Sequence, residues 1–120
     1  MAPDGVPWSG WTGRVVKLVA LVKLAEVGDV APGTGKVVQA GEMALALFNL
    51  GGIFYALNNR CTHVGGPLGE GKVEGTVVTC PWHGSRFDIT NGQVLGPPAR
   101  RPVASYPVQV QGREVFVELP

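Results

Sequence analysis

The sequence is poor in cysteine, in histidine and in charged residues. It has 2 Cys and 2 His in 120 residues, and charged residues make up only 16% of the chain. Two cysteines allow at most one disulfide bridge, so a disulfide-rich secreted scaffold is excluded. The formal net charge of +1 lacks the basic excess that phosphate-backbone binding takes. We therefore expect no nucleic-acid partner.

Long apolar segments are also missing. The apolar stretch from Val15 to Val22 is interrupted by Lys17 and is far shorter than the roughly 20 residues of a membrane span. The first residues carry Asp4 but no positively charged region of the kind that begins a secretory signal. We expect a cytoplasmic protein that has no membrane partner.

Glycine, proline and apolar residues are abundant instead. The chain has 18 Gly, 10 Pro and 45% hydrophobic residues, which favours a compact, turn-rich all-β protein. Its length suits one domain with a modest core. Residues 1–13 hold several prolines and glycines and two tryptophans without strand or helix periodicity, so they predict an N-terminal arm. The domain is expected to cover residues 14–120.

Short apolar stretches separated by turn residues predict antiparallel strands. Residues 14–27 are compatible with a strand pair or a short helix, and the turn residues that follow favour a strand. The pairs Gly41-Glu42, Gly51-Gly52 and Asn91-Gly92 are typical of tight hairpin turns. The further strands are expected at 36–40, 44–49, 53–57, 72–74, 76–79, 86–89, 93–95, 106–110 and 114–119.

All cysteines and histidines fall in two short motifs. Cys61 and His63 lie in C-T-H-V-G-G-P-L, and Cys80 and His83 lie in C-P-W-H-G-S-R-F-D. In a reducing compartment such pairs indicate a metal site. Zinc fingers with two cysteines and two histidines usually place like ligands together, whereas each motif here is mixed. A [2Fe–2S] cluster between two loops fits the mixed order, because each loop must reach both irons.

The two motifs resemble the cluster-binding boxes of Rieske proteins. The Pro97-Pro98 segment is similar to the third loop that covers the cluster in that family, and the resemblance runs from about residue 22 to residue 119. It implies a Rieske-type all-β fold of antiparallel sheets, with a small cluster-binding subdomain of two hairpin loops. The implied cofactor is a Rieske-type [2Fe–2S] cluster.

The resemblance also assigns the ligands. Cys61 and Cys80 would bind one iron through sulfur, and His63 and His83 would bind the other through Nδ1 at the exposed tip of the fold. Ser85 is expected to bind the cofactor by donating a hydrogen bond to a bridging sulfide.

Three positions depart from the high-potential respiratory members of the family. Those proteins have a disulfide-forming cysteine where this chain has Gly66 and Trp82, and a tyrosine where it has Phe87. Hydrogen-bond donors stabilise the reduced, more negative cluster, and this chain has fewer of them. We therefore expect a reduction potential in the low half of the Rieske range of about −150 to +300 mV.

The same pattern is similar to Rieske-type ferredoxins of ring-hydroxylating oxygenases. It implies a one-electron carrier that passes electrons from a flavin-dependent reductase to a terminal oxygenase or another oxidoreductase, and that is no enzyme by itself. Two alternatives remain open at this stage. One is the small Rieske subunit of a nitrite-reductase-like complex, and the other is a structural zinc-binding module.

Further residues near the two motifs are expected to contact partners or to support the site. An apolar rim that meets partners is expected from Val64, Pro81, Trp82 and Pro97, although packing of Trp82 under Pro81 is the simpler interpretation of that residue. Asp88 is expected to brace the second motif. Two interpretations apply to the four arginines Arg60, Arg86, Arg100 and Arg101. They form a ring of positive charge that steers partners, or they are solvated side chains beside turns.

Overall fold

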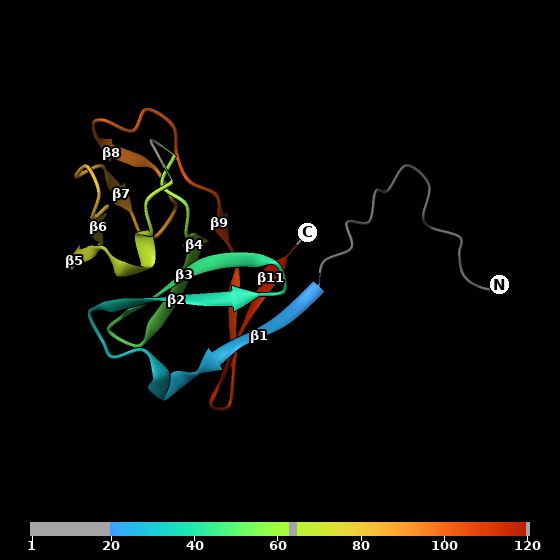
Figure 1. The fold of residues 1–120 in the computed structure, drawn as a ribbon. Coiled ribbons are helices and arrows are strands. Elements are labelled where there is room, and N and C mark those ends of the chain that lie inside the picture. The colour runs from blue at the N-terminus through green and yellow to red at the C-terminus, as the bar shows by residue number, and fades with distance from the viewer. Residues whose placement is uncertain (1–19, 63–64, 120) are drawn as a thin grey trace, which may run out of the picture.

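The computed structural model describes residues 20–62 and 65–119, so the predicted arm at 1–13 lies outside the described residues. The described residues form three antiparallel sheets (Figure 1). This confirms the predicted all-β class. In the first sheet the strand order is β1-β11-β10, with bounds β1 (Ala20–Glu26), β10 (Val108–Gln111) and β11 (Glu114–Leu119).

The second sheet is a meander that contains the strands predicted at 36–40, 44–49 and 53–57. Its order is β2-β3-β4-β9, with bounds β2 (Thr34–Ala40), β3 (Met43–Leu50), β4 (Ile53–Asn58) and β9 (Ser105–Tyr106). The turns fall at the glycines that the sequence indicated. Gly41, Gly51 and Gly52 adopt φ angles of 64°, 67° and 97°, a region that glycine enters without steric cost.

The third sheet is a second meander of very short strands, in the order β5-β6-β7-β8. Their bounds are β5 (Lys72–Glu74), β6 (Val77–Thr79), β7 (Arg86–Asp88) and β8 (Val94–Gly96). One-turn 3-10 helices at Val27–Asp29 and Leu68–Glu70 connect sheets. The strands predicted at 72–74, 76–79, 86–89 and 93–95 are thus present, and they form the hairpins β5-β6 and β7-β8.

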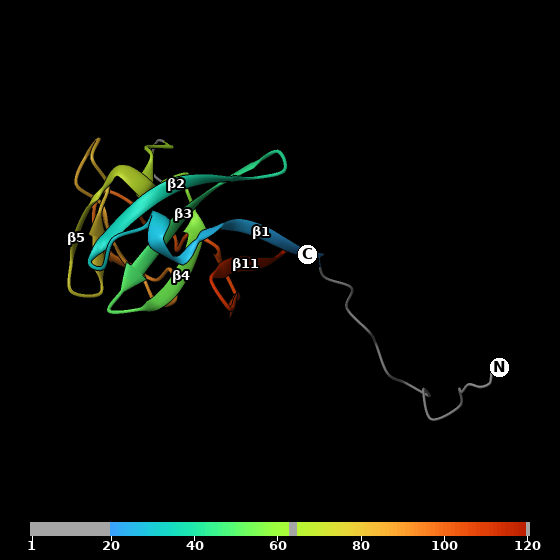
Figure 2. The same ribbon diagram turned by 90° about the horizontal axis from the view of Figure 1, so that it is seen from below.

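Strand β3 joins two hydrophobic cores. Leu45 and Leu47 pack in a core shared with β1 and β11, whereas Ala46 and Phe48 pack in a core shared with the third sheet. Because successive side chains of a strand point to opposite faces, a strand buried on both faces reads as a continuous apolar run. Figure 2 shows β5 and β1 on opposite sides of the β2–β4 region.

The predicted strand 106–110 is wrong in one respect. The structure divides it between two sheets, because Tyr106 pairs with Ala56 of β4 while Val108 pairs with Val117 of β11. Pro107 stands at the break, and it has no N–H to offer either ladder. The last two strands still pair with each other, as the hairpin of β10 and β11.

Candidate metal centre

The first cysteine loop, residues 60–67, leaves the end of β4 and is anchored at its base by two asparagines. The Asn58 side-chain oxygen accepts the Arg60 N–H at 2.9 Å. The Asn59 side chain accepts the Gly69 N–H at 2.7 Å, and its carbonyl accepts the Leu68 N–H at 2.8 Å. The start of the loop and the segment just after it are thereby bonded to the residues at the end of β4.

Within the first loop the backbone closes on itself around Cys61. The Cys61 N–H donates to the Gly66 carbonyl at 2.9 Å, and the Gly65 N–H donates back to the Cys61 carbonyl at 2.8 Å. Gly65 takes a φ of 80°, which residues with a side chain rarely adopt. The glycine is therefore needed to close the loop behind the cysteine.

The second cysteine loop, residues 80–86, follows β6 and repeats the same frame. The Cys80 N–H donates to the Ser85 carbonyl at 2.7 Å, and the Gly84 N–H donates to the Cys80 carbonyl at 3.1 Å. Gly84 has a φ of 79°. The two loops thus present their cysteines from matching backbone positions, which the spacing of the motifs alone did not predict.

The two frames bring the cysteine side chains together. Both thiols are buried and free of disulfide, and they lie within hydrogen-bonding contact of each other. Burial raises the pKa of the Cys80 thiol, and the Cys61 thiol beside it raises that pKa further. The backbone N–H groups of Trp82 and His83 act in the opposite direction, because they donate to the Cys80 sulfur.

Gly66 packs directly against this pair. A Cβ atom added at Gly66 would lie 2.6 Å from the Cys80 sulfur and 3.1 Å from the Trp82 ring. No side chain fits there without movement. The Trp82 indole therefore lies over Gly66, in space that a larger side chain at this position would need.

A third loop, residues 96–102, ties the two cysteine loops to each other. The Ala99 N–H donates to the buried Ser85 hydroxyl oxygen at 3.0 Å. The Thr62 hydroxyl donates to the Arg101 carbonyl at 2.7 Å. Thr62 was missed by the sequence reasoning, since nothing in the motif indicates a contact 39 residues away. The loop also contains the Pro97-Pro98 pair, joined by a cis peptide bond.

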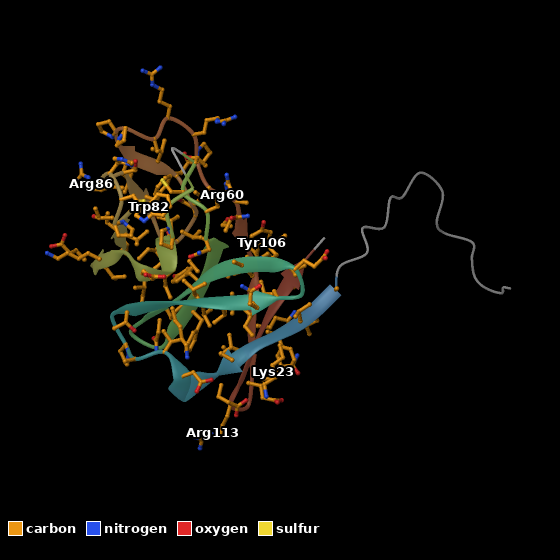
Figure 3. The ribbon with its side chains drawn as sticks, in the orientation of Figure 1. Lys23, Arg60, Trp82, Arg86, Tyr106 and Arg113 are labelled. Atoms are coloured by element: carbon orange, nitrogen blue, oxygen red, sulfur yellow. The ribbon has the colours of Figure 1, made fainter. Side chains whose placement is uncertain are left out.

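Trp82 lies at the exposed end of the site (Figure 3), and its neighbour His83 is also exposed. The Trp82 side chain is 58% exposed, so the interpretation that it packs under Pro81 is wrong and the expected rim position fits. Pro81 and Pro97 are also exposed, whereas Val64 lies outside the described residues. Asp88 braces the β7–β8 turn through Thr90 at 2.8 Å, and no bond from its side chain to the second loop is found among the described residues.

The donor set suits a soft metal centre. Cys61 and Cys80 supply two adjacent sulfurs at the heads of the loops, and His83 lies in the second of these loops. His63 lies outside the described residues, so the structure does not place the fourth predicted ligand. Within the described residues no three His, Cys, Asp or Glu side chains form a metal-binding group. The residues that are placed fit an iron–sulfur cluster, because thiolates are the usual ligands of such clusters and imidazoles replace two of them in Rieske centres.

Comparison with known families identifies a match over most of the chain. A family model described as the Rieske [2Fe-2S] domain matches residues 20–107. Among curated proteins, the ferredoxin subunit of 3-phenylpropionate/cinnamic acid dioxygenase from Escherichia coli (strain K12) is 44% identical over 77 residues. These residues are 63% of this chain and 73% of that relative.

Solved structures share the fold. The Sphingomonas yanoikuyae B1 ferredoxin superposes with a TM-score of 0.79 at 33% identity, over 84% of this chain and all (100%) of that chain. A chain in the complex of reduced oxygenase and oxidized ferredoxin in carbazole 1,9a-dioxygenase superposes with a TM-score of 0.76 at 35% identity. That match covers 81% of this chain and 91% of the other.

Proposed function

The chain belongs to the Rieske [2Fe-2S] domain family, and from that premise we propose that it is a one-electron carrier. Its cofactor is a Rieske-type [2Fe–2S] cluster, which supplies one-electron redox chemistry. We propose Cys61 and Cys80 as the ligands of one iron and His63 and His83 as the ligands of the other. The observation that carries this proposal is the convergence of the two buried thiols from two loops of matching frame.

The side chains around the ligands set the conditions for electron transfer. Ser85 is fully buried and its oxygen already accepts the Ala99 N–H, so its own O–H can donate towards the cluster. Phe87 is also buried and provides no hydroxyl. With one side-chain donor in place of two, we expect a midpoint potential below about +100 mV. Voltammetry of the purified protein measures it, and a higher value would contradict this account.

The proposed partners are a flavin-dependent reductase as electron donor and a terminal oxygenase as acceptor. Support comes from the relatives, which are ferredoxin subunits of a dioxygenase, and from the solved complex between an oxygenase and its ferredoxin. No helix in the described part of the chain has the length and hydropathy needed to cross a bilayer. We propose that the carrier works in the cytoplasm.

Spectroscopy followed by reconstitution tests the proposal. Freshly purified protein is expected to be red-brown and, when reduced, to give an EPR signal of low average g. Replacing His63 or His83 with Asn should abolish that signal, whereas the exposed Lys72→Ala variant should keep it. A colourless protein that holds one zinc ion per chain would overturn the proposal.

Electron transfer is tested separately. A flavin reductase that uses NADH and a ring-hydroxylating oxygenase are mixed with and without the protein, and product formation is followed. The protein is expected to be required for turnover, and the Asn variants should not replace it. Turnover that is equally fast without the protein would contradict the carrier role.

A further inference from the structure

Arginine is concentrated at the cluster end of the molecule. Four of the six arginines lie in the three loops 60–67, 80–86 and 96–102, the other two being Arg14 and Arg113. All 9 Asp and Glu residues lie outside these loops. Although the chain has a net charge of only +1, this one surface is strongly positive.

Two of these arginines lie over glycines of the loops. The Arg60 guanidinium lies over Gly65, with its Cζ 3.2 Å from the position of an added Cβ. The Arg86 guanidinium lies over Gly96 in the same way, with its Nε at 2.9 Å. These two charges therefore lie directly beside the loops. Figure 3 shows Arg60 and Arg86 near Trp82, at the end of the molecule opposite Arg113.

None of the four arginines has an ion-pair partner among residues 20–62 and 65–119. The ion pairs found there involve Lys23 and Lys72. Glu42 lines a neighbouring hollow together with Arg60, but no ion pair joins them. The positive charge at the cluster end is thus not neutralised by this part of the protein itself.

A hollow of about 460 Å³ lies between Arg60 and Arg101 and is also lined by Asn58, Cys61 and Thr62. An arginine on each side of this hollow suits a carboxylate, because a guanidinium group can bind both carboxylate oxygens. Because Cys61 lines the same hollow, a carboxylate seated there would hold its carrier next to the proposed iron ligand.

We propose that the cluster end docks an acidic surface of a redox partner protein, with a partner carboxylate seated between Arg60 and Arg101. This inference rests on the proposed function, since it names the chemistry of the partner that exchanges the electron. An acidic protein surface is favoured over other polyanions because Arg60 and Arg86 lie near Trp82 (Figure 3). Trp82 and its neighbour His83, where the electron is expected to leave, are both exposed. Opposite charges would orient the cluster towards the partner before contact.

Voltammetry of the intact holoprotein on modified gold electrodes tests the docking. A monolayer with terminal carboxylates serves as the probe for an acidic surface, and a monolayer with terminal ammonium groups is its counterpart. Electron exchange is expected to be at least about tenfold faster on the carboxylate layer, because the layer orients the cluster end towards the electrode. Added salt should slow this exchange. Equal rates on the two layers would overturn the proposal.

Charge variants locate the effect. The double variant R60Q/R101Q should lose most of the preference for the carboxylate layer, whereas R113Q, the same charge change at the opposite end, should keep it. The variant R100Q/R101Q leaves the Arg60 contact with Gly65 intact. It should also lose preference for the carboxylate layer over the ammonium layer. An equal loss in R113Q, or gel retardation of duplex DNA by the wild type, would overturn the proposal.

The same samples separate this proposal from the proposed function. Visible absorption and EPR report whether each variant holds the cluster. If the wild type lacks the cluster, the carrier proposal fails. If the cluster is present with an unchanged spectrum and the exchange rate does not depend on the electrode charge, the docking proposal alone fails.

Discussion

Gly66 is the residue on which the space beside the cysteine pair depends most directly. Changing Gly66 to Ala would place a methyl group 2.6 Å from the Cys80 sulfur, so the second loop must move. Overpacking of this kind costs about 1–3 kcal/mol, and here it displaces a proposed ligand. We expect the variant to fold with most of its iron missing, as measured by metal analysis and visible absorption.

Gly28→Ala is the matched control for this variant. Nothing lies within 4 Å of a Cβ added at Gly28, so its iron content should equal that of the wild type. Full iron occupancy in the Gly66→Ala variant would show that the loop can relax at no cost, contrary to our account.

Ser85 is a second residue whose effect reaches beyond its own position. Its hydroxyl oxygen accepts the Ala99 N–H inside the protein, so Ser85→Ala leaves a buried donor without a partner. We expect a loss of about 1–3 kcal/mol in the free energy of unfolding, together with a lower midpoint potential. Denaturant unfolding and voltammetry measure the two effects.

The exposed Ser105 provides the comparison. Ser105→Ala should change the unfolding free energy by less than about 0.5 kcal/mol and leave the potential unchanged. A Ser85→Ala variant that is as stable as this control would refute the structural role assigned to the hydroxyl.

At the scale of secondary-structure elements, β3 is notable because its side chains contribute to both hydrophobic cores. Phe48 is fully buried in the core beneath the cysteine loops, and Phe48→Ala is expected to cost about 3–5 kcal/mol. Ile53, at the start of β4, is 61% exposed, and Ile53→Ala should cost less than about 1 kcal/mol. Denaturant unfolding of both variants checks the contrast, and equal losses would disprove it.

Local signals in the sequence predicted most strands and both cysteine loops. Glycines at positive φ end the strands, and tight turns can be recognised from a few neighbouring residues. The pairing of β1 with β11 could not be predicted in this way. It joins Ala20 to Leu119, and no local pattern encodes which distant strands become neighbours.

The positions of the two cysteine loops could be predicted from the sequence, whereas the contacts that support these loops could not. The spacing of cysteine and histidine indicated the two loops. The bonds from Thr62 to Arg101 and from Ala99 to Ser85 are long-range contacts of ordinary residues, and no motif distinguishes these residues. The change of sheet at Pro107 could have been predicted from the sequence. A proline inside a predicted strand lacks the N–H that a continuous ladder of hydrogen bonds needs.

For the molecule as a whole, the two cores differ in whether they contain the proposed cysteine ligands. The core that contains Cys61 and Cys80 packs beneath the loops, whereas the core around Leu45, Val115 and Val117 contains neither cysteine. We predict that removing the cluster loosens the first core and leaves the second folded. Ligands that bind only the native state stabilise the regions that hold them.

Hydrogen exchange of the holo and apo proteins measures this difference. Amides of the cysteine loops, such as those of Cys80 and Gly84, should lose protection in the apo protein, and those of Val115 and Val117 should keep it. A uniform loss of protection across the chain would contradict two separable cores.

The double burial of β3 also determines where the chain can tolerate a change in length. Inserting a single residue into β3 would reverse the direction of every later side chain, sending Phe48 towards the core of β1 and β11. Only an even number of added residues would preserve the facing. Variation in length among related chains should therefore avoid this strand and collect in the hairpin turns at Gly41, Gly75 and Gly112, where no atom lies within 4 Å of an added Cβ.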